Sequence, residues 1–167
     1  MASEVQRTYR HRLAESVHVE AAPRALFDHL DDHESLASHM MQSSSMMAGG
    51  AMTFTFDEGH GRAIGSRIGM TGKFLGLKLE ASEVVTEREP PNRKAWETTG
   101  RPRLLVIGAY RMGFEIEASS TGSRLTVFID YDLPPWPSRL LGQIAGRFYA
   151  RWCVQSMAND AVRAFAA

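Results

Sequence analysis

The sequence lacks the features that would cross-link the chain or anchor it in a membrane. Cys153 is the only cysteine among 167 residues, so no internal disulfide can form. No apolar run approaches the ~20 residues that a membrane-spanning helix needs. The first residues also lack the apolar core of a signal peptide. We therefore expect a cytoplasmic protein with no membrane span.

The chain also lacks an excess of charge of either sign. It has 19 basic and 19 acidic residues, so its formal net charge is zero. This balance argues against a nucleic-acid partner, because binding to phosphates needs a basic surface. The length is that of one domain. We expect residues 1–167 to form a single domain, with residues 1–12 as a frayed lead-in.

The C-terminal segment carries the clearest helical pattern. After the prolines of residues 134–137, Ser138 can cap a helix that we predict over residues 138–165. Apolar residues then recur at steps of three and four, which is typical of one helix face. They are Leu141, Ile144, Ala145, Phe148 and Trp152. Such a helix is roughly 40 Å long, which is too long for a small domain unless other elements wrap it.

The preceding residues supply those elements, because most of them alternate apolar and polar side chains as strands do. The predicted strands cover residues 13–20, 52–56, 66–72, 77–89, the region of Trp96, 104–118 and 125–133. Two short helices are predicted after the first strand, from Pro23 to Leu30 and from Glu34 to Met41. Short turns between strands indicate an antiparallel sheet. The fold class is therefore α+β, with a curved sheet around the C-terminal helix.

Three stretches with this order of elements resemble the helix-grip superfamily, which includes START-like, Bet v 1-like and polyketide cyclase/dehydrase proteins. The stretches are residues 17–27, 84–91 and 122–134. The resemblance covers about residues 14–166. It implies a seven-stranded antiparallel sheet that grips the helix, and an apolar cavity between them. Such cavities hold a lipid, sterol, quinone or polyketide-like molecule.

The predicted ligand-binding residues are the apolar side chains that alternation places on the inner face. They are Met52, Phe54, Phe56, Met70, Trp96, Tyr110, Met112, Phe114, Ile129, Tyr131, Phe148 and Trp152. The alternative is that these side chains simply fill a solid core. We assign no titrating residue to the pocket, no cofactor and no catalytic residue. A homodimer is left open.

Two other functions remain as alternatives. An enzyme of the cyclase/dehydrase kind would need a general acid or base, for which Tyr110, Tyr131 and Glu115 are candidates. Alternation places Glu115 outside the sheet, which weakens its case. A protein-interaction module would use the basic residues of the C-terminal helix. These are Arg139, Arg147, Arg151 and Arg163, which we interpret as its solvent-exposed face.

Several features have a structural interpretation that we prefer. His29 and His33 have the spacing of helix-borne metal ligands but no third ligand, so we expect a solvated helix end and no metal. Cys153 is expected to be a small buried side chain. The methionines at positions 40, 41, 46 and 47 are interpreted as side chains that fill gaps, with a flexible gate at the cavity mouth as the alternative. Finally, Gln155, Ser156 and Asn159 either orient a ligand or lie at the edge of the buried face.

Overall fold

The computed structural model describes residues 7–36, 52–74 and 76–166. Seven strands form one sheet, which is accompanied by helices. The strands are β1 (His11–Val19), β2 (Met52–Phe56), β3 (Arg67–Phe74), β4 (Leu77–Glu89), β5 (Arg93–Arg103), β6 (Tyr110–Ser119) and β7 (Gly122–Tyr131). The helices are α1 (Pro23–Asp31) and α3 (Arg139–Ala164), and residues 33–36 are also helical.

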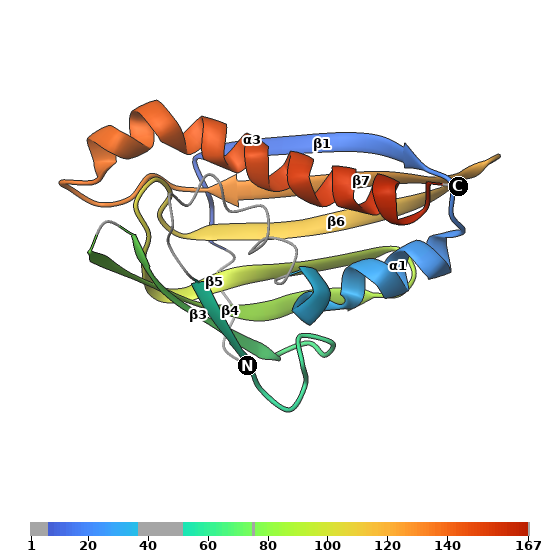
Figure 1. Ribbon diagram of the computed structural model, residues 1–167, viewed down its shortest axis with the longest axis horizontal. Coiled ribbons are helices and arrows are strands. Elements are labelled where there is room, and N and C mark those ends of the chain that lie inside the picture. Colours follow the sequence, from blue (N-terminus) through green and yellow to red (C-terminus); the bar gives the residue numbers. More distant parts are fainter. Residues whose placement is uncertain (1–6, 37–51, 75, 167) are drawn as a thin grey trace.

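The sheet is antiparallel throughout, with the order β1-β7-β6-β5-β4-β3-β2. Irregular register between Glu80 and Ser82, and between Val85 and Glu87, interrupts the pairing of β4 with β5. Such bulges bend a strand and increase its twist. Figure 1 shows α3 running along β1 and β7, with α1 at the end of the sheet where α3 ends. The predicted helix-grip architecture is confirmed.

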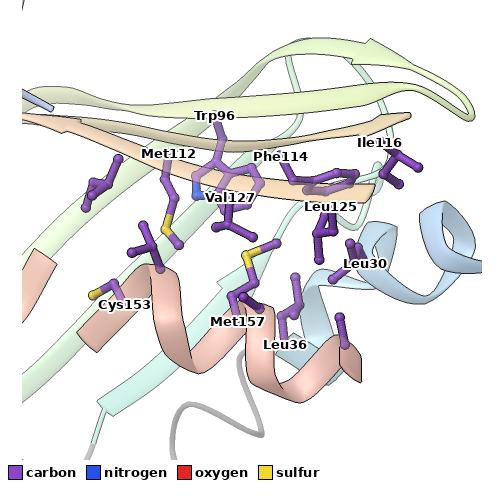
Figure 2. Close-up of a cluster of buried hydrophobic side chains, with 14 of the residues drawn as sticks. Leu30, Leu36, Trp96, Met112, Phe114, Ile116, Leu125, Val127, Cys153 and Met157 are labelled. Carbon is purple, nitrogen blue, oxygen red and sulfur yellow. The ribbon is translucent and has the colours of Figure 1, made fainter. Parts of the chain in front are cut away.

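The core lies between the sheet and the C-terminal half of α3. Alternate residues of β6 and β7 face inward and are buried, as the period of two predicted: Tyr110, Met112, Phe114, Ile116, Leu125, Val127, Ile129 and Tyr131. Figure 2 shows strand side chains such as Met112 and Val127 pointing towards Cys153 and Met157 of α3. Ala150, Ala158 and Ala161 are also buried on this helix, so α3 approaches the sheet closely.

Two predicted boundaries need correction. The strand predicted from residue 104 begins at Tyr110, because residues 104–109 form an irregular segment whose Gly108 NH donates to the carbonyl of Asp132. The lead-in is shorter than predicted, since His11 already pairs with Tyr131 in the sheet. Most of the predicted helix from Glu34 to Met41, and the four methionines at positions 40, 41, 46 and 47, lie outside the described residues.

The predicted buried face of the C-terminal helix is wrong in its N-terminal half. Phe148 is 72% exposed and Ile144 is 73% exposed, whereas Gly142 and Gly146 are buried. A Cβ at Gly142 would lie 2.5 Å from Cδ of Pro134, and one at Gly146 would lie 2.8 Å from the carbonyl oxygen of Val106. This half of α3 therefore contacts the rest of the molecule through glycines, and its large apolar side chains point away.

Candidate functional site

A cavity of about 520 Å³ lies between the sheet and α3. This volume is within the range of small-molecule sites. Eight of the twelve predicted ligand-binding residues line it: Met52, Phe54, Phe56, Met70, Trp96, Tyr110, Met112 and Ile129. They come from β2, β3, β5, β6 and β7, and their inward direction follows from the alternation along each strand.

The other four predicted residues do not line this cavity. Phe114 is fully buried and packs edge-on against Phe27 of α1, with ring centroids 5.6 Å apart. Tyr131 is buried beneath His11, with a centroid distance of 5.1 Å. Trp152 is only partly buried, next to Tyr149, and Phe148 is exposed to solvent.

One buried acid faces the cavity, contrary to our expectation of a pocket without titrating residues. Glu83 of β4 is 5% exposed, and its carboxylate accepts a hydrogen bond from the hydroxyl of Tyr110. Burial raises the pKa of Glu83 to about 7, and the hydrogen bond from Tyr110 only partly opposes this. The pKa of Tyr110 is raised as well, mainly by burial and then by the nearby carboxylate. Glu83 can therefore gain or lose a proton near neutral pH.

A second polar pair borders the cavity from α3. Tyr149 and Cys153 are four residues apart, lie on one helix face and both line the cavity. Burial raises the pKa of Cys153 to about 12, so its thiol stays protonated. A protonated, buried thiol is a poor nucleophile. The predicted role of Cys153 as a buried side chain is confirmed.

A buried charge cluster lies where α1 ends against β5. The ammonium of Lys94, whose side chain is fully buried, donates to Oδ1 of Asp31 at 2.7 Å and to Nδ1 of His33 at 2.9 Å. Arg88 reaches the other oxygen of Asp31 at 2.8 Å. Burial alone would raise the pKa of Asp31, but hydrogen bonds from Arg88 and Lys94 outweigh it and lower that pKa. The aspartate thus stays ionised and compensates the buried lysine.

This charge cluster determines the protonation state of His33, which lines the cavity. Burial, with the charge of Lys94, lowers the pKa of His33 to about 3, so the ring is neutral. An ammonium can only donate, so Nδ1 accepts and Nε2 carries the proton. Nε2 has no hydrogen-bond partner among the described residues, and the ring stands edge-on to Trp96 at 4.5 Å. The prediction of a solvated helix end is therefore wrong for His33.

The two histidines that suggested a metal site face different partners. Nε2 of His29 lies 3.4 Å from Oδ2 of Asp160, while His33 contacts Lys94. Within residues 7–36, 52–74 and 76–166, no group of three or more His, Cys, Asp or Glu side chains could hold a metal ion. Of the other residues considered for chemistry, Glu115 is exposed and Tyr131 lies outside the cavity lining.

The polar residues at the C-terminal end of α3 divide between our two interpretations. Ser156 and Asn159 line the cavity, although Asn159 is also exposed to solvent, whereas Gln155 is exposed and does not line it. Arg163 is exposed and also borders the cavity. Sequence reasoning missed Glu83, whose only signal was its inward position in the alternation of β4. It also missed the link from Lys94 to His33, which brings together residues 61 positions apart.

The fold and the cavity define a helix-grip protein. The model of the family described as "Polyketide cyclase / dehydrase and lipid transport" matches residues 10–164. The chain therefore belongs to this family. Comparison with curated proteins gives no significant sequence match. In the part of the chain that the structure describes, no helix is long and apolar enough to cross a membrane.

Three solved structures illustrate the likeness of the fold. TTHA0849 from Thermus thermophilus is 15% identical, with a TM-score of 0.63, and the match covers 94% of this chain and 100% of that one. A point mutant of norcoclaurine synthase from Thalictrum flavum, in complex with a transition-state analogue, is 14% identical with a TM-score of 0.63, covering 96% and 97%. CV1439 from Chromobacterium violaceum is 14% identical with a TM-score of 0.62, covering 92% and 96%. At these identities the likeness shows the fold alone.

Proposed function

We propose that this protein binds a small hydrophobic molecule in the cavity between the sheet and α3, with lipid, quinone, sterol or polyketide-like chemistry. The observation that carries the proposal is the 520 Å³ cavity, whose lining is mainly apolar but includes Glu83 and Tyr110. An apolar wall supplies affinity, and a few buried polar groups orient the ligand. The protein would act in the cytoplasm, without a nucleic-acid partner.

The pair of Glu83 and Tyr110 suggests that the ligand carries an oxygen atom that accepts a hydrogen bond, such as a carbonyl oxygen. A protonated Glu83 can donate a hydrogen bond, whereas an ionised Glu83 cannot. The pKa of about 7 means that the donor form dominates below neutral pH. A carbonyl ligand should therefore bind more weakly as the pH rises from 6 to 8, while a hydrocarbon of the same shape should show a much smaller change.

Fluorenone and fluorene are suitable probes, because they share a shape and differ by one carbonyl oxygen. Trp96 is the only tryptophan among the cavity-lining residues, so its fluorescence should change when a probe enters. The measurement is made in a Trp136→Phe, Trp152→Phe background, which leaves Trp96 as the reporter. Binding should be micromolar, about −8 kcal/mol, and should raise the melting temperature.

A blocking variant tests the location of the site. Met112→Trp should fill the cavity and abolish binding in calorimetry, with the helix content unchanged. Glu117→Trp is the matched control, because residue 117 lies on the same strand and is exposed. If neither probe binds the unmodified protein, and fatty acids, sterols and aromatic polyketides also fail to bind, the proposal is wrong. Equal binding to the Met112→Trp variant would place the ligand elsewhere.

An enzyme of the cyclase/dehydrase kind is the second candidate, favoured by Glu83 together with Tyr110, which is one of the three residues that the sequence suggested. A carboxyl group with a pKa of about 7 can act as a general acid and base near neutral pH. In an aldol cyclisation it would take a proton from the carbon next to a carbonyl. The resulting enolate would attack a second carbonyl carbon, and Glu83 would return the proton to the alkoxide that forms. Loss of water would need a second transfer, in which Glu83 removes another proton from the same carbon and delivers it to the departing hydroxyl group.

The enzyme hypothesis is tested with a bound ketone, such as 2-tetralone, in D2O. The protein should accelerate exchange of the protons next to the carbonyl, as measured by NMR. Glu83→Gln should abolish this acceleration and retain binding, whereas Tyr110→Phe should reduce it. Binding without accelerated exchange would leave the protein a binder and exclude this general-base role.

A further inference from the structure

The N-terminal half of α3 and the segment before it expose most of the large apolar side chains that reach solvent. Among the described residues, eight large hydrophobic side chains are exposed, and five of them lie between residues 136 and 148. We call these five the apolar stripe: Trp136, Leu140, Leu141, Ile144 and Phe148, which are 75%, 57%, 47%, 73% and 72% exposed. The other three, Ile64, Leu77 and Val162, are separate in sequence. A concentration of this kind marks an interaction surface.

The helix geometry makes the four stripe residues on α3 continuous. Leu140, Ile144 and Phe148 are four residues apart and form one row, and Leu141 lies beside them. The opposite side of this half is occupied by Gly142 and Gly146, which contact Pro134 and the carbonyl of Val106. No rotation of the helix could bury the stripe without losing these contacts. The exposure is therefore built into the packing of α3.

The charges around the stripe are of one sign. Residues 133–159 contain no Asp or Glu and include Arg139, Arg147 and Arg151. All three arginines are exposed, and none forms an ion pair with a described residue. Arg147 is three residues from Ile144, and Arg151 is three residues from Phe148, so both border the stripe. The surface thus combines apolar side chains with unpaired positive charge.

We propose that the apolar stripe docks on the surface of an anionic phospholipid bilayer, with α3 lying in the plane of the membrane. The apolar side chains would enter the boundary between head groups and acyl chains. Arg147 and Arg151 would extend to lipid phosphates while their aliphatic stems stay near the apolar layer. The zero net charge of the whole chain does not oppose this, because the positive charge is local.

The charge distribution also argues against a second copy of the chain as the occupant. A two-fold dimer places the same patch of both copies face to face. The stripe would then bring Arg147 and Arg151 close to their own counterparts. The acid-free segment of residues 133–159 supplies no carboxylate to compensate them. A bilayer that contains anionic lipid offers both the apolar layer and the compensating charge.

The test measures binding of the full chain to two kinds of vesicle, one of phosphatidylcholine and one of phosphatidylcholine mixed with phosphatidylglycerol. We expect cosedimentation with the anionic vesicles, weakened by salt, and a blue shift of Trp136 fluorescence that brominated lipid quenches. Binding to the neutral vesicles should be at least about tenfold weaker. Trp136→Phe should remove the spectral shift.

Matched variants separate the apolar and the charged contributions. Ile144→Ser with Phe148→Ser should weaken binding at least about tenfold. Arg147→Gln with Arg151→Gln should weaken it about thirtyfold on anionic vesicles, at about fivefold per residue. The controls are Ile64→Ser, an exposed apolar residue outside the stripe, and Arg124→Gln, an exposed arginine of β7. Both controls should bind as the unmodified protein does.

Each other outcome overturns the proposal. Equal binding to neutral and anionic vesicles would exclude the role of the arginines. A dimer in sedimentation analysis that Ile144→Ser dissociates, without vesicle binding, would show that the stripe joins two copies. A monomer that binds neither vesicle would show that the partner is not a membrane. The stripe variants should bind fluorenone as the unmodified protein does. A failure to bind vesicles would therefore leave the proposed ligand binding in the cavity untouched.

Discussion

The two halves of α3 behave as different helices that share one backbone. The C-terminal half buries Cys153, Val154 and Met157, and Figure 2 shows Cys153 and Met157 facing the strands. Both of these residues line the cavity. The N-terminal half presents glycines inward and large apolar side chains outward. Both halves have apolar residues at helical spacing. The difference shows that helical periodicity identifies an apolar face but not the surface that this face contacts.

The largest expected effect comes from placing a charge on each half. Val154→Asp would bury an unpaired carboxylate in the core and should destabilise the protein by about 3–5 kcal/mol, or prevent folding. Ile144→Asp should change the free energy of unfolding by less than about 0.5 kcal/mol, since residue 144 is exposed. Urea denaturation measures both. Equal losses would contradict the contrast between the halves.

The next effect concerns the acid inside the cavity that the C-terminal half covers. The pKa of Glu83 is about 7 in the folded protein and 4.5 as the unperturbed value. The folded state therefore binds more protons between these values. The contribution of Glu83 to the free energy of unfolding is therefore fully present below pH 4.5. It is lost as the pH rises through 7, and the loss is on the order of 3 kcal/mol. In Glu83→Gln this contribution should disappear from urea denaturation curves measured between pH 5 and 8. An unchanged pH profile would mean that Glu83 is not buried as described.

The glycine contacts of the N-terminal half predict an intermediate effect. Gly146→Val would place atoms against the carbonyl oxygen of Val106, which a Cβ alone would approach to 2.8 Å. Overpacking of this kind should cost about 1–3 kcal/mol in thermal or urea denaturation. Gln143→Val, on the exposed side, is the control and should cost less than about 0.5 kcal/mol. Tolerance of valine at position 146 would mean that α3 does not depend on this close approach.

The smallest expected effect on stability is that of Phe148→Ala. If Phe148 were packed against the sheet, its loss would cost about 3–5 kcal/mol. Because the side chain is 72% exposed, we expect a change of less than about 0.5 kcal/mol in urea denaturation. A loss above about 2 kcal/mol would mean that Phe148 packs against the sheet, as the sequence pattern predicted. It would also remove the basis for the apolar stripe.

The order of elements and the inner faces of the strands could be predicted from the sequence. In β6 and β7 the period of two identifies the buried side chains, because successive residues of a strand face opposite sides. The long C-terminal helix followed from its spacing of apolar residues. Many of the cavity-lining residues could also be predicted, since eight of the twelve predicted ligand-binding residues border the cavity.

Tertiary contacts decided the rest. The stripe of Ile144 and Phe148 has the spacing of a core-facing helix, and only the contacts of Gly142 and Gly146 turn it outward. His33 becomes a neutral, buried group because Lys94, 61 residues away, donates to its ring. Glu83 acquires a pKa of about 7 because the fold removes it from water beside Tyr110. Periodicity records which side chains share a face, whereas burial and pKa depend on what the fold places against that face.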